Sequence, residues 1–296
     1  ATNASSSGKS AFAGFVGRLN YAYDDKYLIE ASFRYDGSYL FHKDHRWGFF
    51  PSVSVGWVMS QEDFFQSALP KIEYFKLRGS IGTLGNDNVT AFLYRKQFAY
   101  NASSVAFGST PASQGTLSNS VAFPFEDLTW ERTRTYDIGF EMSAWNGLLG
   151  VEFDYFYKYT FNILQSIGGI YPPSLGGHYP AYINDGTFDN RGFELVLRHR
   201  NRIGKFSYGV TGNLTFARNR ILSKQQADNT LPWKNVLGSS LGALWGLKSD
   251  GLYQTEEELA NAPKPIGVQP RLGDIKYVDV NGDGVIDSYD EVPICY

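Results

Sequence analysis

The residues best suited to chemistry lie near the end of the chain, in the stretch DVNGDGVIDSYD (279–290). Oxygen-bearing side chains recur at alternate positions, and a glycine follows in the sixth place, which is the spacing of an EF-hand-type calcium loop. Ca²⁺ is a hard cation that takes about six to eight oxygen ligands, so carboxylates on a tight turn suit it. The spacing predicts a structural calcium site formed by Asp279, Asn281, Asp283, the backbone carbonyl of Val285, Asp287 and Asp290.

The same residues also fit a simpler interpretation, a turn that binds no metal. Asn-Gly and Asp-Gly are common hairpin-turn dipeptides, and Val285-Ile286 reads as a short edge strand. The last ligand of the calcium template is usually a bidentate Glu, whereas Asp290 stands there and Glu291 comes one place late. The match over the six positions of the D-x-[DN]-x-[DN]-G pattern (279–284) is harder to obtain by chance than either dipeptide. We therefore expect a calcium clamp on a loop and not a calcium-triggered switch.

Aromatic side chains outside the regular pattern are the second candidate for binding. Flat rings stack on sugar rings or grip peptide side chains, although aromatic residues are also routine packing within a compact loop region. A G-x-S-x-G nucleophile motif is absent from the sequence, and SGKS (7–10) lacks the earlier glycine of a phosphate-binding loop, so we expect no enzyme. The candidate substrate-binding residues are Tyr171, Tyr179, Tyr182, Trp233, Trp245 and Tyr253.

A period of two residues dominates the part of the chain that must position these groups. In YLIEASFRYD (27–36), apolar and aromatic residues alternate with Glu30, Ser32, Arg34 and Asp36. The same alternation recurs along residues 11–217 and predicts about eight strands, each near the length that a tilted membrane-crossing strand needs. Charged residues expected on the polar, inward face are Arg18, Glu30, Arg34, Arg78, Glu141, Glu152, Glu194 and Arg198.

Short and long connections alternate between these strands, which is typical of outer-membrane barrels with short periplasmic turns and long extracellular loops. The pattern predicts an all-β fold, an antiparallel transmembrane β-barrel. A soluble β-sandwich or propeller also alternates, but no repeat of about 40–50 residues supports a propeller. Short links are expected at 24–26, 145–147 and 200–205, an intermediate one at 60–73, and long ones at 37–47, 84–130, 163–188 and after 218.

The composition agrees with β-structure and excludes some partners. Aromatic residues make up 16% of the 296 residues, and there are 31 glycines. The net charge of -3 gives no electrostatic basis for nucleic-acid binding. The single cysteine, Cys295, excludes a disulfide framework within the chain. A mean hydropathy of -0.29 is compatible with a membrane barrel, because lipid-facing and lumen-facing residues cancel in the average.

Two consecutive stretches resemble a known family. LTWERTRTYDIGFE (128–141) and LLGVEFDYFYKYT (148–160) are similar to barrel strands of the SusC/RagA family of TonB-dependent outer-membrane transporters. Other stretches resemble the same family and occur in its order. They are YLIEASFRYDGS (27–38), FFPSVSVGWVMSQEDF (49–64), KLRGSIGTLGND (76–87), DNRGFELVL (189–197), GLKSDGLYQTEEEL (246–259) and GDIKYVDVNGDGVIDSYD (273–290).

The resemblance implies a barrel of about 22 strands with a plugged lumen. It also implies active import of glycans or peptides across the outer membrane of a Gram-negative, Bacteroidetes-like cell, with a SusD-like surface lipoprotein and TonB as partners. Residues 1–296 would be part of that barrel, without the plug domain, so TonB would act through parts N-terminal to this chain. Residues 218–296 would be a long extracellular loop region, with a short helix at Thr255–Ala260 and the calcium loop.

Two alternatives stay open at this point. One is a passive porin or adhesin barrel in the outer membrane, which a plug domain upstream would exclude. The other is a soluble calcium-binding, glycan-binding β-domain, which would fold without detergent. In the importer, the charged residues of the inward face would contact plug, solvent or ligand.

Overall fold

The computed structural model describes residues 10–101, 117–122, 124–167, 171–172, 174, 182–226 and 230–295. The chain forms two compact units, Ala1–Arg218 and Asn219–Tyr296. In the part of the chain that is described, no helix is both long enough and apolar enough to span a membrane.

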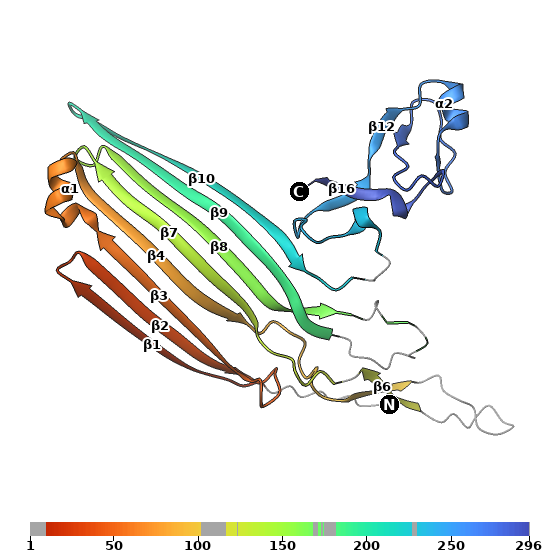
Figure 1. Ribbon diagram of the computed structural model, residues 1–296, viewed down its shortest axis with the longest axis horizontal. Helices are drawn as coiled ribbons and strands as arrows, with labels where there is room; N and C mark the ends of the chain where they lie inside the picture. The colour runs from red at the N-terminus through yellow and green to blue at the C-terminus, as the bar shows by residue number, and fades with distance from the viewer. Residues whose placement is uncertain are drawn as a thin grey trace. The chain divides into compact units, whose positions relative to one another are not determined.

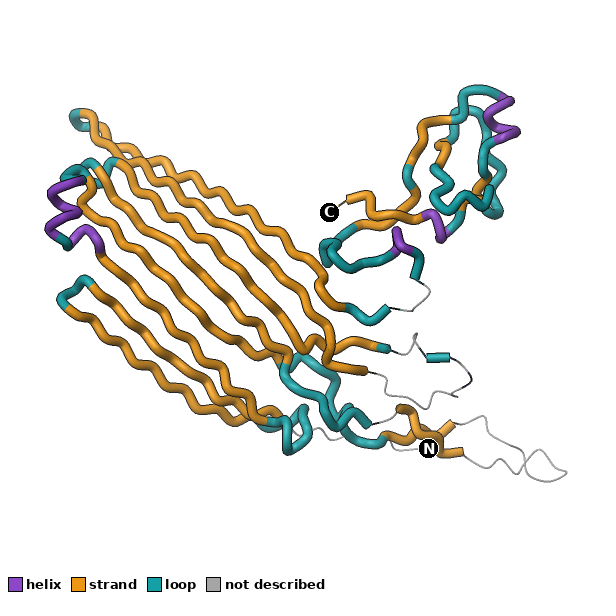
Figure 2. The backbone as a smooth tube through the Cα atoms, in the orientation of Figure 1, coloured by secondary structure: helices purple, strands orange, loops and turns teal. Residues whose placement is uncertain are grey.

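The first unit is an eight-stranded antiparallel sheet, which confirms the predicted fold class (Figure 1, Figure 2). Its strands lie beside one another in the order in which they occur along the chain. This is the arrangement that tight hairpins and long return loops produce. The strands are β1 (Phe12–Tyr23), β2 (Tyr27–Ser38), β3 (Trp47–Val58), β4 (Ile72–Asn86), β7 (Glu131–Ala144), β8 (Leu149–Ser166), β9 (Tyr182–Ile203) and β10 (Phe206–Ser223).

Several strands run further than the alternation predicts. β4 continues to Asn86, which pairs with Glu131 at the start of β7. β8 and β9 stay paired as far as Ser166 and Tyr182. Backbone ladders do not require alternating side chains, so pairing persists where the pattern of apolar residues has already ended. The long connections are therefore shorter than the sequence indicated, and one of them contains an antiparallel pair of β5 (Gln97–Asn101) and β6 (Leu117–Ala122).

One face of the sheet is apolar and exposed. Val55, Ile81 and Ile138 lie in the middle of their strands and are 53%, 44% and 64% exposed. Phenylalanine rings form a stacked row across this face, with centroids 5.4–6.2 Å apart. An apolar surface of this extent needs a non-aqueous neighbour. The row consists of Phe65, Phe75, Phe140, Phe153, Phe193 and Phe216.

The two ends of the sheet differ. At one end the strands are joined by tight turns, where Asp24 and Asp25 adopt positive φ values of 53° and 49° and Trp145 and Asn146 both adopt 57°. The 3₁₀ turn η1 (Met59–Gln61) and the helix α1 (Asp63–Ala68) join β3 to β4 at this end, in a link for which the sequence predicted no helix. At the other end, longer connections surround a small core of Phe41, Phe50, Leu128 and Trp130.

The second unit is built from short elements around a small core. β11 pairs with β16 and β12 with β14, both antiparallel, while β13 pairs with β15 in parallel. Tyr253 and Ile286 are each 2% exposed. The elements are η3 (Pro232–Lys234), β11 (Leu244–Leu247), β12 (Ser249–Leu252), α2 (Glu256–Asn261), β13 (Lys264–Pro265), β14 (Ile275–Tyr277), β15 (Val285–Ile286), η4 (Ser288–Asp290) and β16 (Glu291–Cys295).

The helix α2 begins with the side-chain cap that its sequence suggests. The Thr255 hydroxyl oxygen accepts a hydrogen bond from the Glu258 N–H at 3.1 Å. In a capping box the Glu258 carboxylate would accept from the Thr255 N–H, but here it accepts from the Gln254 N–H at 2.9 Å, one residue earlier.

Candidate functional site

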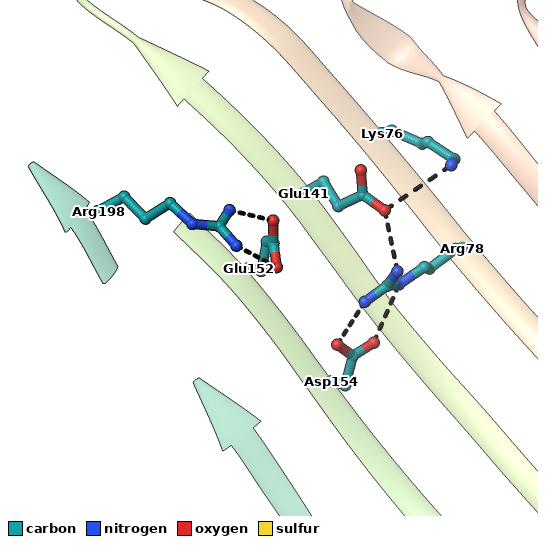
Figure 3. Close-up of polar contacts among 6 residues, drawn as sticks. All are labelled: Lys76, Arg78, Glu141, Glu152, Asp154 and Arg198. Carbon is teal, nitrogen blue, oxygen red and sulfur yellow. Dashed lines mark hydrogen bonds and ion pairs between the residues drawn. The ribbon is translucent and has the colours of Figure 1, made fainter. Parts of the chain in front are cut away.

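Arg78 is the centre of an ion-pair network on the polar face of the sheet (Figure 3). Its Nε donates to one Asp154 oxygen at 3.0 Å, its Nη2 donates to the other, and its Nη1 donates to Glu141 at 2.9 Å. Lys76 Nζ lies 3.7 Å from the same Glu141 carboxylate. The network joins β4 to β7 and β8 through side chains as well as backbone.

A glycine makes possible the contact between Arg78 and Asp154, which crosses the strand between them. Arg78 on β4 and Asp154 on β8 both stand opposite Gly139 on the intervening strand β7. A Cβ at position 139 would lie 2.5 Å from the Phe153 carbonyl oxygen and would overlap the Asp154 carboxylate. The guanidinium and the carboxylate can therefore meet across the strand only because position 139 has no side chain.

The charged residues predicted for the inward face are largely paired within the sheet. Arg18 donates to Glu30 at 2.6 Å, Arg34 Nε donates to Asp36 at 2.9 Å, and Arg198 donates to Glu152. Arg78 and Glu141 belong to the network described above. These pairs neutralise one another, so the face is polar and hydrogen-bonding without presenting a strong field of either sign.

A hollow with a volume of about 870 Å³ lies over the sheet on this surface. Acidic and basic side chains both line it, with serine, threonine and asparagine between them. Such a lining can hydrogen-bond to a polar ligand. Its charged members are Glu30, Lys76, Arg78, Asp137, Asp154, Lys158 and Glu194.

The predicted calcium loop forms a tight turn closed by its own amides. The Asp279 carboxylate accepts from the N–H groups of Gly282 at 2.7 Å and Gly284 at 2.8 Å. Both glycines adopt positive φ values, 76° and 83°, which a residue with a Cβ adopts only with strain. The side-chain oxygen Oδ1 of Asn281 accepts from the Asp283 N–H at 3.0 Å. The turn is therefore organised by side chain–backbone bonds between near neighbours.

Asp290 closes the turn from inside the unit. It is fully buried, and its two oxygens accept the N–H groups of Val280 at 2.8 Å, Asn281 at 3.3 Å and Asp287 at 3.0 Å. Burial pulls the pKa of this carboxyl upward, but the three donating amides outweigh burial and hold the pKa below its usual range. Asp290 thus has a structural role that requires no metal.

The donor set of the turn suits Ca²⁺ in chemistry, and the structure supplies a competing use for each carboxylate. Asp279 and Asp283 accept amides, Asp287 accepts the Tyr289 N–H at 2.6 Å, and Glu291 is paired with Lys234. Within the described ranges, no three His, Cys, Asp or Glu side chains gather in a metal-binding arrangement. Accepting oxygens keep a further lone pair, so Asp279, Asn281, Asp283 and the Val285 carbonyl could still ligate. Calcium at this turn stays a prediction.

Comparison with known proteins identifies the family. A sequence profile described as TonB dependent receptor-like, beta-barrel matches residues 1–291. The chain belongs to this family.

Relatives and solved structures agree with the assignment. The chain is 33% identical to TonB-dependent receptor P26 of Formosa agariphila over 95% of its length, and 28% identical to TonB-dependent receptor SusC of Bacteroides thetaiotaomicron over 96%. It spans 28% of each of these two relatives. The RagAB peptide importer in its 'open-open' state shares the fold, with a TM-score of 0.75 and 20% identity over 97% of this chain and 29% of that one.

Membership in the TonB dependent receptor-like barrel family explains the two faces of the sheet. Barrels of outer-membrane proteins direct alternate side chains to lipid and to the lumen. The row of stacked phenylalanines lies on the lipid-facing side, and the Arg78 network lies on the lumen-facing side. The family consists of receptors and transporters and not of enzymes, in agreement with the sequence.

The candidate aromatic residues fall into different environments. Trp233 donates its indole N–H to the Tyr289 carbonyl oxygen at 2.7 Å, and Trp245 stands opposite Pro293 in the β11–β16 ribbon. Tyr253 is buried and donates its hydroxyl to the Pro263 carbonyl oxygen at 3.2 Å, so the structure shows it in a packing role. Tyr171 is half-buried and Tyr182 begins β9, while Tyr179 lies outside the described residues. Ligand contact by this set stays a prediction.

Sequence reasoning missed part of the lumen-facing network. Lys76 and Asp154 were recognisable as polar-face residues from the alternation, but nothing in the spacing showed which side chains would pair. Gly139 was a usable signal, because a glycine within a strand pattern often marks a close approach. Pairing across strands depends on register, and a shift by two residues keeps every side chain on its face, so the alternation does not select the partner.

Proposed function

We propose that this chain forms part of the wall of an active importer in the outer membrane of a Gram-negative, Bacteroidetes-like bacterium. The observation that carries the proposal is the family match over residues 1–291, together with a sheet that is apolar on one face and polar on the other. The ligand would be an oligosaccharide or a peptide. SusC and the RagAB peptide importer are similar to this chain and motivate those two classes.

The lumen-facing side would provide a polar but electrically balanced wall. Because Arg78, Arg198 and Arg18 are each paired with carboxylates of the same sheet, they do not form an unpaired cationic surface. Such a wall hydrogen-bonds weakly to a passing ligand and does not trap ligands of one charge. Function would consist of binding and release without covalent chemistry.

Energy and capture would come from partners outside this chain. In our proposal TonB displaces a plug held in the barrel, and a SusD-like lipoprotein covers the extracellular opening. The plug and the TonB contact would belong to other parts of the full-length protein. Residues 219–295 would lie on the extracellular side, where the long connections of such barrels lie.

The decisive experiment measures uptake of labelled oligosaccharides and peptides by cells that express the full-length protein, with and without TonB. We expect uptake of one ligand class that disappears when either protein is deleted. Uptake that persists without TonB would show a passive pore and contradict the proposal. Co-purification of a surface lipoprotein in mild detergent tests the partner separately.

A further inference from the structure

The helix α1 lies at the end of the sheet where tight turns join the strands (Figure 1). Its rings contact the apolar face. Phe65 is buried and stacks on Phe75 of β4, with ring centroids 5.4 Å apart. The ring of Phe64 lies beside that of Trp57 of β3, with the two ring centroids 6.4 Å apart. Trp57 and Phe75 both belong to the apolar register of their strands, so the helix rests against the face that we assign to lipid.

The outer side of α1 continues this apolar face. Phe64 is 58% exposed, and Leu69, directly after the helix, is 47% exposed. An unbroken row of aromatic rings runs along the strand ends, with successive ring centroids 6.3–6.4 Å apart. The row consists of Tyr23, Tyr27, Trp57 and Phe64. The exposed ring of Phe64 is thus an extension of the lipid-facing surface and not an isolated apolar residue.

A single carboxylate gathers the polar groups of this row. Glu62, at the start of α1, accepts hydrogen bonds from the Tyr27 hydroxyl at 2.7 Å, the Trp57 indole N–H at 3.2 Å and the Lys26 ammonium at 3.3 Å. The polar tips of the amphipathic rings therefore meet at one level, with apolar ring surface beside them. Tyr and Trp adopt this arrangement where water meets hydrocarbon.

Neighbouring barrel strands cannot cover the helix. β3 and β4, which α1 connects, are paired with each other, and their outer edges are paired with β2 and β7. Any further strand of the barrel must therefore add beyond β1 or β10. The surface beside Phe64 is continuous with the lipid-facing side of the wall, and the same medium should reach both.

We propose that α1 is an interfacial helix that inserts Phe64 and Leu69 into the periplasmic leaflet of the outer membrane, with phospholipid as the occupant of this surface. Tight turns mark the periplasmic end of an outer-membrane barrel, which selects the leaflet. Interfacial helices lie about 5–10 Å deep, at the boundary of headgroups and acyl chains. The proposal rests on the outer-membrane location proposed above, and it goes beyond it by fixing the depth at which the wall sits.

Depth-dependent fluorescence quenching tests this placement. The full-length transporter, with Cys295→Ser and other native cysteines replaced, is reconstituted into phospholipid vesicles. A fluorophore is attached at Phe64→Cys, at Ile138→Cys in the middle of β7, or at Asp25→Cys in the β1–β2 turn. Lipids carry a nitroxide either near the headgroup or near the methyl end of the acyl chain. Heat-modifiable electrophoretic migration verifies that each labelled barrel is folded.

We expect the label at position 64 to be quenched more by the shallow nitroxide than by the deep one. The label at 138 should show the reverse order, and the label at 25 should be quenched by neither. If the label at 64 is quenched by neither nitroxide while the label at 138 is quenched, the interfacial helix is overturned. Water, a periplasmic protein or a second copy would then cover the surface beside Phe64. An unquenched label at 138 would instead contradict the membrane location itself.

Discussion

The eight-stranded sheet and the small unit after it stabilise their folds in opposite ways. The sheet has strands of 12–22 residues, long backbone ladders and large apolar side chains left exposed along one face. The small unit has strands of two to five residues, a few buried side chains, and a turn held by carboxylates that accept backbone amides. One region depends on a partner medium for its apolar surface, while the other depends on its own polar side chains.

This difference predicts how strongly single substitutions should destabilise each region. In the sheet, hydrogen bonds run between strands, so the loss of one side chain leaves most of the ladder intact. In the small unit, single carboxylates satisfy several amides at once, and buried amides are costly to leave unsatisfied. We therefore expect the largest effects of single substitutions in the smaller region.

The most damaging substitution should be Asp290→Ala. It leaves the amides of Val280, Asn281 and Asp287 without an acceptor inside the unit, at about 1–3 kcal/mol each. Hydrogen exchange of residues 279–290 in the full-length protein should increase strongly, while the sheet stays protected. Asp274→Ala is the matched control, because that exposed carboxylate accepts the Arg271 N–H. Equal exchange in the two variants would contradict the role of Asp290.

Calcium should stabilise the small unit and not the sheet, because the predicted calcium loop belongs to the small unit. Ca²⁺ at a free concentration of about 100 times its dissociation constant would stabilise the folded unit by about 2.7 kcal/mol. Addition of Ca²⁺ should slow exchange at Gly282 and Gly284 and leave the strands of the sheet unchanged. Asp283→Ala should abolish the response and Asp274→Ala should retain it. Identical exchange with calcium and with chelator would show that the turn is organised by its amides alone.

Within the sheet, Gly139→Ala should have the largest effect. The added methyl group overlaps the Asp154 carboxylate and approaches the Phe153 carbonyl oxygen, which separates Asp154 from Arg78 at a cost of about 1–3 kcal/mol. Gly79→Ala is the matched control, because the nearest atom to a Cβ there is 3.7 Å away. Urea unfolding from phospholipid vesicles compares the two variants. A loss that is equal at 79 and 139 would mean that the cross-strand ion pair does not contribute.

The smallest effect is expected from pH at Glu62, where the sheet meets α1. Hydrogen bonds from Tyr27 and then Trp57 hold the pKa of Glu62 below its ordinary value of 4.5. A carboxyl with a depressed pKa stabilises the fold above its unfolded pKa, and this contribution is lost as pH falls through the folded pKa. Acid should therefore loosen α1 at pH values below about 4.5.

Glu62→Gln should remove this pH dependence, as measured by proteolysis at residues 60–70 between neutral and acidic pH. Asp63→Asn changes the exposed carboxylate at the next position and serves as the control. If both variants keep the acid sensitivity of the parent, the titrating group lies elsewhere.

Much of the sheet could be predicted because its cause is local. Alternation of YLIEASFRYD and its counterparts selects strands, and residues such as Asp24-Asp25 and Asn146-Gly147 tolerate the positive φ that tight hairpins need. The spacing of Asp279, Asn281 and Asp283 likewise indicated a tight turn, because each side chain bonds to an amide two to five residues further on.

The sequence by itself thus determined the strands, their faces, the tight turns and the family. The tertiary structure alone decided that Arg78 reaches Asp154 over Gly139, that α1 packs Phe65 on Phe75, and that Asp290 is buried among three amides. Those contacts join residues that alternation treats as equivalent, and they depend on which strands become neighbours and in which register. Short-range periodicity predicts which face of the sheet a side chain occupies. It does not predict which residue that side chain contacts, because the contact forms only when distant segments pack.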